Sequence, residues 1–167
     1  MIRKAEKKDY AEILKLNQKD VEMLSELDKN LLEKMDELSE IFNVVEIEDN
    51  VVAFIIAFRD GCEYWSDNYK WFNNHYSNFI YIDRIVIDEN YRKQGLARKL
   101  YENIFRYAQE KSCKLVCAEI DIKPEYNHPS MKFHKKMGFV EVGQKISKKT
   151  ITVSLQIREI PDHIPNC

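Results

Sequence analysis

The most informative segment of the chain reads Arg92-Lys93-Gln94-Gly95-Leu96-Ala97. It follows an apolar, strand-like run at residues 81–87 and precedes a stretch from Leu96 to Ala108 in which apolar residues recur four apart, as in an amphipathic helix. The first amides of a helix have no intrahelical acceptor and lie at the positive end of its dipole. This strand-to-helix junction can therefore bind a pyrophosphate.

Gly95 is the residue on which this interpretation depends. A Cβ there would hold a phosphate away from the amides. Ala97, the next smallest residue, stands at a second position where the phosphate must come close to the backbone. The alternative is that Gly95 only permits a tight turn. No Walker loop and no Gly-x-Gly-x-x-Gly fingerprint follows any expected strand, which disfavours both common nucleotide-binding folds.

A second block supports the ligand-binding interpretation. After an apolar run at residues 114–121 comes the segment 127–139, which begins with Asn127, carries Ser130 and ends in Gly138-Phe139. With both blocks in this order, the chain resembles the GNAT family of N-acetyltransferases. The resemblance is tight over residues 79–143 and looser elsewhere, and residues 81–85 also resemble an uncharacterised bacterial branch of that family.

The resemblance implies an α/β architecture with a mixed (α+β) sheet, the GNAT-like acyl-CoA N-acyltransferase fold. In that fold a central, mostly antiparallel sheet contains two parallel strands that splay apart, and helices flank it. Here the splayed strands would be residues 81–87 and 115–121. Since no Pro/Gly/Ser-rich linker or repeat appears, we expect a single GNAT N-acetyltransferase domain over residues 1–167.

Periodicity predicts the remaining elements. We expect a strand at residues 2–5, a helix from Asp9, and a second helix capped by Asp28. The buried face of this second helix is predicted to comprise Leu31, Met35, Leu38 and Phe42. Further along we expect a hairpin around Asp49-Asn50, a helical turn near 68–76 and a last strand within 148–160.

Length and composition agree with a single compact domain. The chain has 167 residues, an apolar fraction of 44% and a net charge of −2, which disfavours a general nucleic-acid surface. The charged start and the lack of an apolar run predict a cytoplasmic protein that neither spans nor binds a membrane. The sequence leaves the oligomeric state open, a homodimer included.

The four cysteines do not form a recognisable framework. Cys62, Cys113, Cys117 and Cys167 show no Cys-x-x-Cys spacing and no neighbouring His ligands, so we expect thiols and no metal site. Cys117 is the only one that could be considered an acyl-carrying nucleophile. A small hydrophobic role is the more common one for a cysteine in a strand.

Acetyl-CoA is the co-substrate that the resemblance implies, with direct transfer to an amine in a ternary complex. The same resemblance implies that backbone N–H groups near Ile85 and Ile87 bind the pantetheine arm and polarise the acetyl carbonyl. Asn127 and Ser130 would contact the cofactor as well. The pyrophosphate would bind at the turn formed by Arg92, Lys93, Gln94, Gly95, Leu96 and Ala97.

Acetyl transfer needs a general base, and the two parallel strands carry three carboxylates. Asp83 lies on the first, and Glu119 and Asp121 share one face of the second. Crowding raises carboxyl pKa values, so Glu119 could accept the amine proton; it is our first choice, with Asp83 second and Asp121 expected to bind substrate. The alternative is that Asp83 forms an ordinary ion pair with Arg84 or Lys114.

His134 occupies a position where many GNAT members carry Tyr. An imidazole there could protonate the departing thiolate near neutral pH. The alternative is that this histidine only fills space near the cofactor.

The acceptor is expected to contact the segment 59–78, which holds both tryptophans of the chain. Tyr64, Trp65, Tyr69 and Trp71 could form an aromatic wall for a cationic amine, although packing is the commoner role of such clusters. We expect a small primary amine as acceptor. Two alternatives are a non-catalytic acyl-CoA-binding or regulatory module, and an enzyme that acetylates protein N-termini or lysines.

Overall fold

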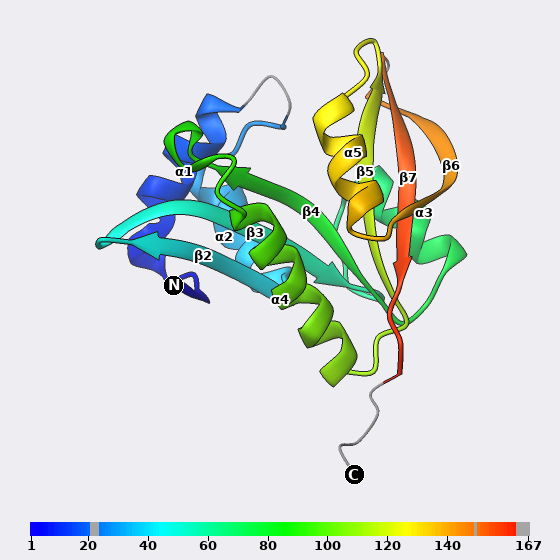
Figure 1. Ribbon diagram of the computed structural model, residues 1–167, viewed down its shortest axis with the longest axis horizontal. Helices are drawn as coiled ribbons and strands as arrows, with labels where there is room; N and C mark the ends of the chain where they lie inside the picture. The colour runs from blue at the N-terminus through cyan, green and yellow to red at the C-terminus, as the bar shows by residue number, and fades with distance from the viewer. Residues whose placement is uncertain (21–23, 149, 163–167) are drawn as a thin grey trace. The chain divides into compact units, whose positions relative to one another are not determined.

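A computed structural model describes residues 1–20, 24–148 and 150–162 (Figure 1). The chain divides into two compact units, each built from two segments. Unit 1 comprises Met1–Phe58 and Ile82–Ile104, and unit 2 comprises Arg59–Tyr81 and Phe105–Cys167. The single domain expected from the sequence stays a prediction. Cys167 lies outside the described residues.

The strands follow the order β1-β2-β3-β4-β5-β7-β6, and β4 (Phe79–Ile87) contributes to both units. In unit 1, β1 pairs with β2 and β2 with β3 in antiparallel fashion, whereas the start of β4 pairs in parallel with β5 (Leu115–Lys123) in unit 2. The mixed sheet with helices that the sequence predicted is therefore confirmed.

Unit 1 begins with β1 (Ile2–Lys4), which pairs with β2 (Ile41–Ile47), which in turn pairs with β3 (Asn50–Arg59). Glu48 and Asp49 form the β2–β3 turn with φ values of 49° and 63°. Both values lie in the left-handed region that a two-residue hairpin turn requires. The turn thus lies one residue earlier than the Asp49-Asn50 position we expected.

Helices cover both faces of the unit 1 strands. Phe42 of β2 stacks on Tyr10 of α1 (Tyr10–Lys19), with 6.3 Å between ring centroids. The next residue, Asn43, donates its side-chain amide to Asn103 of α4 (Leu96–Glu110) at 3.2 Å. Because successive strand residues point to opposite faces, α1 and the first part of α4 lie on opposite sides; Figure 1 shows the same arrangement.

Helix α2 (Lys29–Leu38) begins as predicted and ends earlier. The Asp28 carboxylate accepts the backbone N–H of Leu31 at 2.7 Å, which confirms the expected cap. The predicted apolar face is partly wrong: Leu32 and Met35 are the buried residues, and Phe42 belongs to β2. The apolar and β-branched run from residue 41 pairs better as a strand than it would continue a helix.

Unit 2 contains the parallel pairing of β4 with β5, in register from Phe79 opposite Leu115 to Tyr81 opposite Cys117. Strand β7 (Ile151–Glu159) then pairs antiparallel with β5, and β6 (Val140–Ser147) pairs antiparallel with β7. Strand β6 was not predicted from the sequence. Its residues are mostly exposed or half-buried, so it lacks the apolar alternation that revealed the other strands.

Two helices cover opposite faces of the unit 2 strands. Phe72 of α3 (Asp67–His75) packs against Tyr81, with ring centroids 5.7 Å apart. Cys117 lies opposite Tyr81 in register, so α3 covers the face that carries Cys117 and Glu119. On the other face, Gln156 of β7 contacts the sulfur of Met131 in α5 (His128–Lys136) at 3.5 Å.

Candidate functional site

The predicted anion-binding turn lies in unit 1 between β4 and α4. After a 3₁₀ turn at Glu89–Tyr91, Lys93 and Gly95 have φ values of 61° and 80°. The Gly95 carbonyl accepts the N–H of Lys99 at 3.1 Å, which is the first helical hydrogen bond. Gly95 therefore stands at the helix N-terminus, where the amides of Leu96 and Ala97 have no intrahelical acceptor.

The space beside Gly95 is open. A Cβ built on this residue would meet no heavy atom within 4 Å, apart from its chain neighbours. Packing therefore does not require glycine here, whereas the positive φ favours it. Arg92, Lys93 and Gln94 are exposed beside it, so the turn joins accessible amides to two cationic side chains.

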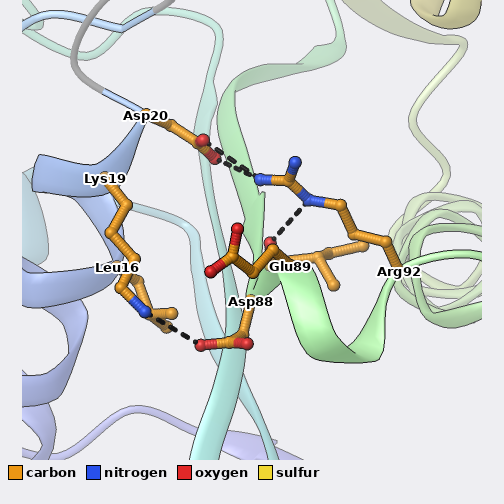
Figure 2. A pocket seen from close by; sticks show the side chains of 7 residues that line it. Leu16, Lys19, Asp20, Asp88, Glu89 and Arg92 are labelled. Carbon is orange, nitrogen blue, oxygen red and sulfur yellow. Dashed lines mark hydrogen bonds and ion pairs between the residues drawn. The ribbon is translucent and has the colours of Figure 1, made fainter.

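Arg92 connects this turn with the end of α1. Its Nη2 donates to both carboxylate oxygens of Asp20, at 3.1 and 3.2 Å, and its Nε donates to the Ile87 carbonyl at 3.1 Å (Figure 2). Lys19 pairs with Asp88 at 3.4 Å, and the pKa of Asp88 lies below its ordinary value, chiefly because the Asn90 backbone N–H donates to it. These contacts surround a pocket of about 360 Å³ that is lined by Leu16, Lys19, Asp20, Ile87, Asp88, Glu89 and Arg92.

Strand β4 carries the second-choice base in a buried ion pair. The Arg84 Nε lies 2.8 Å from the Asp83 carboxylate, and both side chains are almost fully buried. Arg84 also donates to the Asn17 side chain at 3.1 Å and to the Ser25 hydroxyl at 2.8 Å. The pairing that we weighed as the alternative for Asp83 is therefore present.

Ile85 and Ile87, whose backbone groups we expect to bind the pantetheine arm, occupy alternate, half-buried positions of β4. The carbonyl of Ile87 already accepts from Arg92. The contact of their N–H groups with the arm stays a prediction.

The first-choice base, Glu119, lies on β5 in unit 2 and is held by two donors. Its Oε1 accepts the Tyr81 hydroxyl at 2.7 Å and the Asn68 side-chain amide at 3.2 Å. Hydrogen bonds donated to a carboxylate favour its ionised form. Donors from β4 and α3 thus hold the Glu119 carboxylate, a group that can accept a proton, in position.

Asp121 follows two residues later on β5, on the same face as Glu119. Burial raises the pKa of this carboxyl, and the positive charge of Lys148 acts in the opposite direction. Its backbone carbonyl accepts the N–H of Asn127 at 3.0 Å, which fixes the start of the next helix. Binding of substrate by Asp121 stays a prediction.

Helix α5 brings Asn127, Ser130 and His134 together. The Asn127 side chain caps the helix by accepting the Ser130 N–H at 3.2 Å. The His134 Nδ1 lies 2.8 Å from the Ser130 carbonyl, and since a carbonyl only accepts, Nδ1 carries the hydrogen. His134 is 5% exposed, and burial lowers its pKa, so its neutral form is favoured.

Two of the four proposed wall residues in the segment 59–78 lie in the core. Tyr64 and Tyr69 are 4% and 1% exposed, and the Tyr69 hydroxyl donates to the Arg59 carbonyl at 2.6 Å. Trp71 stacks on His75 with ring centroids 4.0 Å apart, whereas Trp65 is 42% exposed. Packing therefore accounts for Tyr64 and Tyr69, whereas Trp71 is half-buried and Trp65 is exposed.

Sequence reasoning missed the partners of Glu119. The sequence predicts a helical turn that contains Asn68 and a strand that contains Tyr81, but not their contact with Glu119. Lys145 lies on β6, which was not predicted, and its Nζ donates to the Asn68 side chain at 3.1 Å. A polar Asn between aromatic residues on the buried side of a predicted helix was the available signal. Among the described residues, no group of three His, Cys, Asp or Glu side chains could hold a metal ion.

Comparisons with known proteins concern the family and the fold. The sequence profile of the acetyltransferase (GNAT) family matches residues 5–139, which include parts of both units. A search of curated protein sequences finds no match.

Solved structures share the fold at low sequence identity. Ard1 from Thermoplasma volcanium is 19% identical with a TM-score of 0.78, covering 97% of this chain and 98% of its own. The yncA protein of Salmonella typhimurium, solved with its cofactor acetyl-CoA, is 17% identical with a TM-score of 0.72. The match covers 100% of this chain and 97% of the yncA chain. The ribosomal-protein-S18-alanine N-acetyltransferase of Escherichia coli is 14% identical with a TM-score of 0.71. The match covers 100% of this chain and 97% of the Escherichia coli chain.

None of the helices within the described ranges combines the length and the apolar character needed to cross a bilayer.

Proposed function

Because the chain belongs to the GNAT family of acetyltransferases, whose acetyl donor is acetyl-CoA, we propose that it acetylates a primary amine of a small molecule. The amine attacks the thioester directly in a ternary complex, so no acyl-enzyme forms. Burial supports this route, because it raises the pKa of the Cys117 thiol far above its ordinary value. A neutral, buried thiol is a poor nucleophile.

The observation that carries the proposal is the Glu119 carboxylate on β5. A primary amine is protonated near neutral pH and must lose a proton before it can attack. Glu119 accepts hydrogen bonds from Tyr81 and Asn68, which hold its carboxylate in one orientation. We assign Glu119 the role of general base, acting directly or through a water molecule.

The donor site is assigned to the turn before α4. Acetyl-CoA supplies an acetyl group activated as a thioester, and its pyrophosphate is the anion for which the turn is suited. The open space at Gly95, the amides at the start of α4 and the exposed side chains of Arg92 and Lys93 support this assignment. Contact of Asn127 and Ser130, at the start of α5, with the cofactor stays a prediction.

Protonation of the leaving thiolate by His134 stays a prediction with a distinctive pH signature. In its neutral form this imidazole already donates its one N–H to the Ser130 carbonyl, so it must gain a second proton before it can act as an acid. Burial disfavours that gain. An acid role therefore predicts a rate that falls as the pH rises through the lowered pKa of His134, below its ordinary value of about 6.5, whereas a packing role predicts no such fall.

A small acceptor is supported by the segment between β3 and β4. Helix α3 covers the face of unit 2 that carries Glu119, and Asn68 of this helix contacts the carboxylate itself. Tyr69 and Phe72 fill the space against Tyr81. A small amine can enter a covered site as a single molecule, whereas a peptide acceptor needs an open groove. The covered Glu119 carboxylate therefore favours a small amine.

A second candidate is acetylation of a protein N-terminus. The observation in its favour is the structural likeness to the Escherichia coli enzyme named for the alanine of ribosomal protein S18. At 14% identity the likeness concerns the fold, so this candidate ranks second.

The experiment is an acceptor panel in which release of free CoA from acetyl-CoA is followed. The panel contains small primary amines, amino acids, and peptides with free N-termini or internal lysines. Turnover with a small amine above the peptide rates supports the proposal, and turnover with peptides alone overturns the small-molecule assignment. Binding of acetyl-CoA without release for any acceptor would favour a non-catalytic module. A cytoplasmic location stays a prediction that cell fractionation would check.

A further inference from the structure

One side-chain amide links the proposed base to a distant cation. Asn68 of α3 is 9% exposed and has a partner on each side. Its Nδ2 donates to the Glu119 Oε1 at 3.2 Å, and its Oδ1 accepts from the Lys145 Nζ at 3.1 Å. The three residues come from β5, α3 and β6, all within unit 2.

The chemistry of the two partners fixes the orientation of this amide. A lysine ammonium can only donate, so the oxygen of Asn68 must face Lys145 and the NH₂ group must face Glu119. An ionised carboxylate accepts a hydrogen bond at either oxygen, which completes the chain. If the amide were flipped, its oxygen would face the carboxylate oxygen and its NH₂ group would face the ammonium, so both contacts would be repulsive.

We propose that Lys145 is a positioning residue for Glu119. Lys145 acts through the oriented amide of Asn68 and keeps the Glu119 carboxylate ionised, so that it is ready to accept a proton. The inference rests on the proposed function, in which Glu119 is the general base. It adds a residue from the strand that the sequence analysis missed.

The other charged and titratable groups on this face act on Glu119 in known directions. The Tyr81 hydroxyl from β4 donates to the carboxylate and favours its charge. Cys117 and Asp121 lie two residues to either side on β5; Cys117 is held neutral by burial, and a charged Asp121 disfavours a second charge. The charge of Asp60 acts on Cys117 as well. Lys145, through Asn68, and Lys148, which acts on Asp121, are the cations that oppose this repulsion.

Lys145 is placed to act on Glu119 through its hydrogen bond to the Asn68 amide instead of through long-range electrostatic attraction. Besides Asn68, its Nζ contacts the Ile146 carbonyl at 3.4 Å, and its side chain is half-buried. Lys148 lies three residues further along the chain and is exposed. It carries the same charge without a hydrogen bond to Asn68 in the described structure, which makes it a matched control.

The test compares Lys145→Met with Lys148→Met and with the conservative Lys145→Arg. The first readout is the pH dependence of kcat/KM for the acceptor amine. The second, independent of turnover, is the titration of the Glu119 carboxyl by NMR, assigned with Glu119→Gln. For Lys145→Met we expect the midpoint of the acidic limb and the carboxyl titration to move upward by about one pH unit. Lys148→Met should shift both by much less, because Lys148 has no hydrogen bond to Asn68 in the described structure, and Lys145→Arg should keep both close to their wild-type values.

A double-mutant cycle tests the route through the amide. In an Asn68→Leu background, the further change Lys145→Met should give no additional shift, because the amide that transmits the effect is gone. Equal shifts in both backgrounds would overturn the role of Asn68. A shift for Lys148→Met with none for Lys145→Met would overturn the proposal and assign the acidic limb to Asp121.

The same experiment separates the failure of this inference from failure of the proposed function. If Glu119→Gln is inactive while Lys145→Met titrates like the wild-type protein, only the role of Lys145 is refuted. If Glu119→Gln keeps the wild-type rate, the assignment of the general base is refuted as well.

Discussion

Substitution of Gly95 by Ala tests the donor site with a control that the chain itself provides. Gly95 has φ +80° and open space where a Cβ would lie, and exposed Gly61 has φ +77° with equally open space. An L-residue in this backbone region costs about 1–2 kcal/mol. Gly95→Ala and Gly61→Ala should therefore lower the free energy of unfolding by similar amounts, with Tm lower by about 2–4 °C per kcal/mol.

Their effects on acetyl-CoA should differ sharply. A methyl group at residue 95 would stand between the pyrophosphate and amides that make charge-assisted hydrogen bonds, each contributing about 1.5–3 kcal/mol. The loss of one or two such bonds amounts to about 3 kcal/mol, which is about a hundredfold in Kd. Calorimetric titration with acetyl-CoA should show this loss for Gly95→Ala and wild-type affinity for Gly61→Ala. Equal affinities in the two variants would refute the assignment of the turn.

Three further predictions concern the base, the buried histidine and a helix cap. Glu119→Gln should lower the rate of acetyl transfer about a hundredfold near neutral pH with little change in acetyl-CoA affinity, because it keeps size and polarity but cannot accept the proton. Because burial lowers the pKa of His134, the unfolded chain binds this proton more readily, so the free energy of unfolding should fall as pH drops below about 6.5, and less so in His134→Gln. Asp28→Ala should lower the free energy of unfolding by about 1 kcal/mol through loss of the α2 cap, measured by urea denaturation.

Each of these has an outcome that would contradict it. Retained activity in Glu119→Gln together with its loss in Asp83→Asn would reverse our ranking of the carboxylates. An identical acid dependence of unfolding in the wild type and His134→Gln would mean that His134 does not titrate as a buried neutral group. For the cap, the control is Asp28→Asn, which can still accept the Leu31 N–H; a loss as large as that of Ala would rule out the cap as the cause.

The parts of the fold that the sequence predicted are those determined by local patterns. The helix that begins at Leu96 follows from apolar residues four apart, and the Asp28 cap needs only a carboxylate three residues before a backbone N–H. The pairing of Asp83 with Arg84 joins neighbours in the chain. Strand β6 was missed because an exposed edge strand needs no apolar alternation.

The site was less predictable because its contacts join distant residues. Glu119 meets Tyr81 across 38 positions and Asn68 across 51, and Asn68 meets Lys145 across 77. No spacing rule relates side chains at such separations, so only the carboxylate itself could be nominated. The aromatic segment shows the same limit: Tyr64 and Trp65 are neighbours in sequence, yet the first is core and the second is exposed.

The central claim is that the acetyl group moves from acetyl-CoA to the nitrogen of a small primary amine. The most direct measurement is mass spectrometry of the acceptor after reaction with acetyl-CoA that carries a deuterated acetyl group, using wild-type enzyme and Glu119→Gln in parallel. We predict an amine product that bears the intact labelled acetyl group with wild-type enzyme, and far less of it with the variant. A labelled peptide with no labelled small amine, or CoA released with the label only in free acetate, would contradict the account.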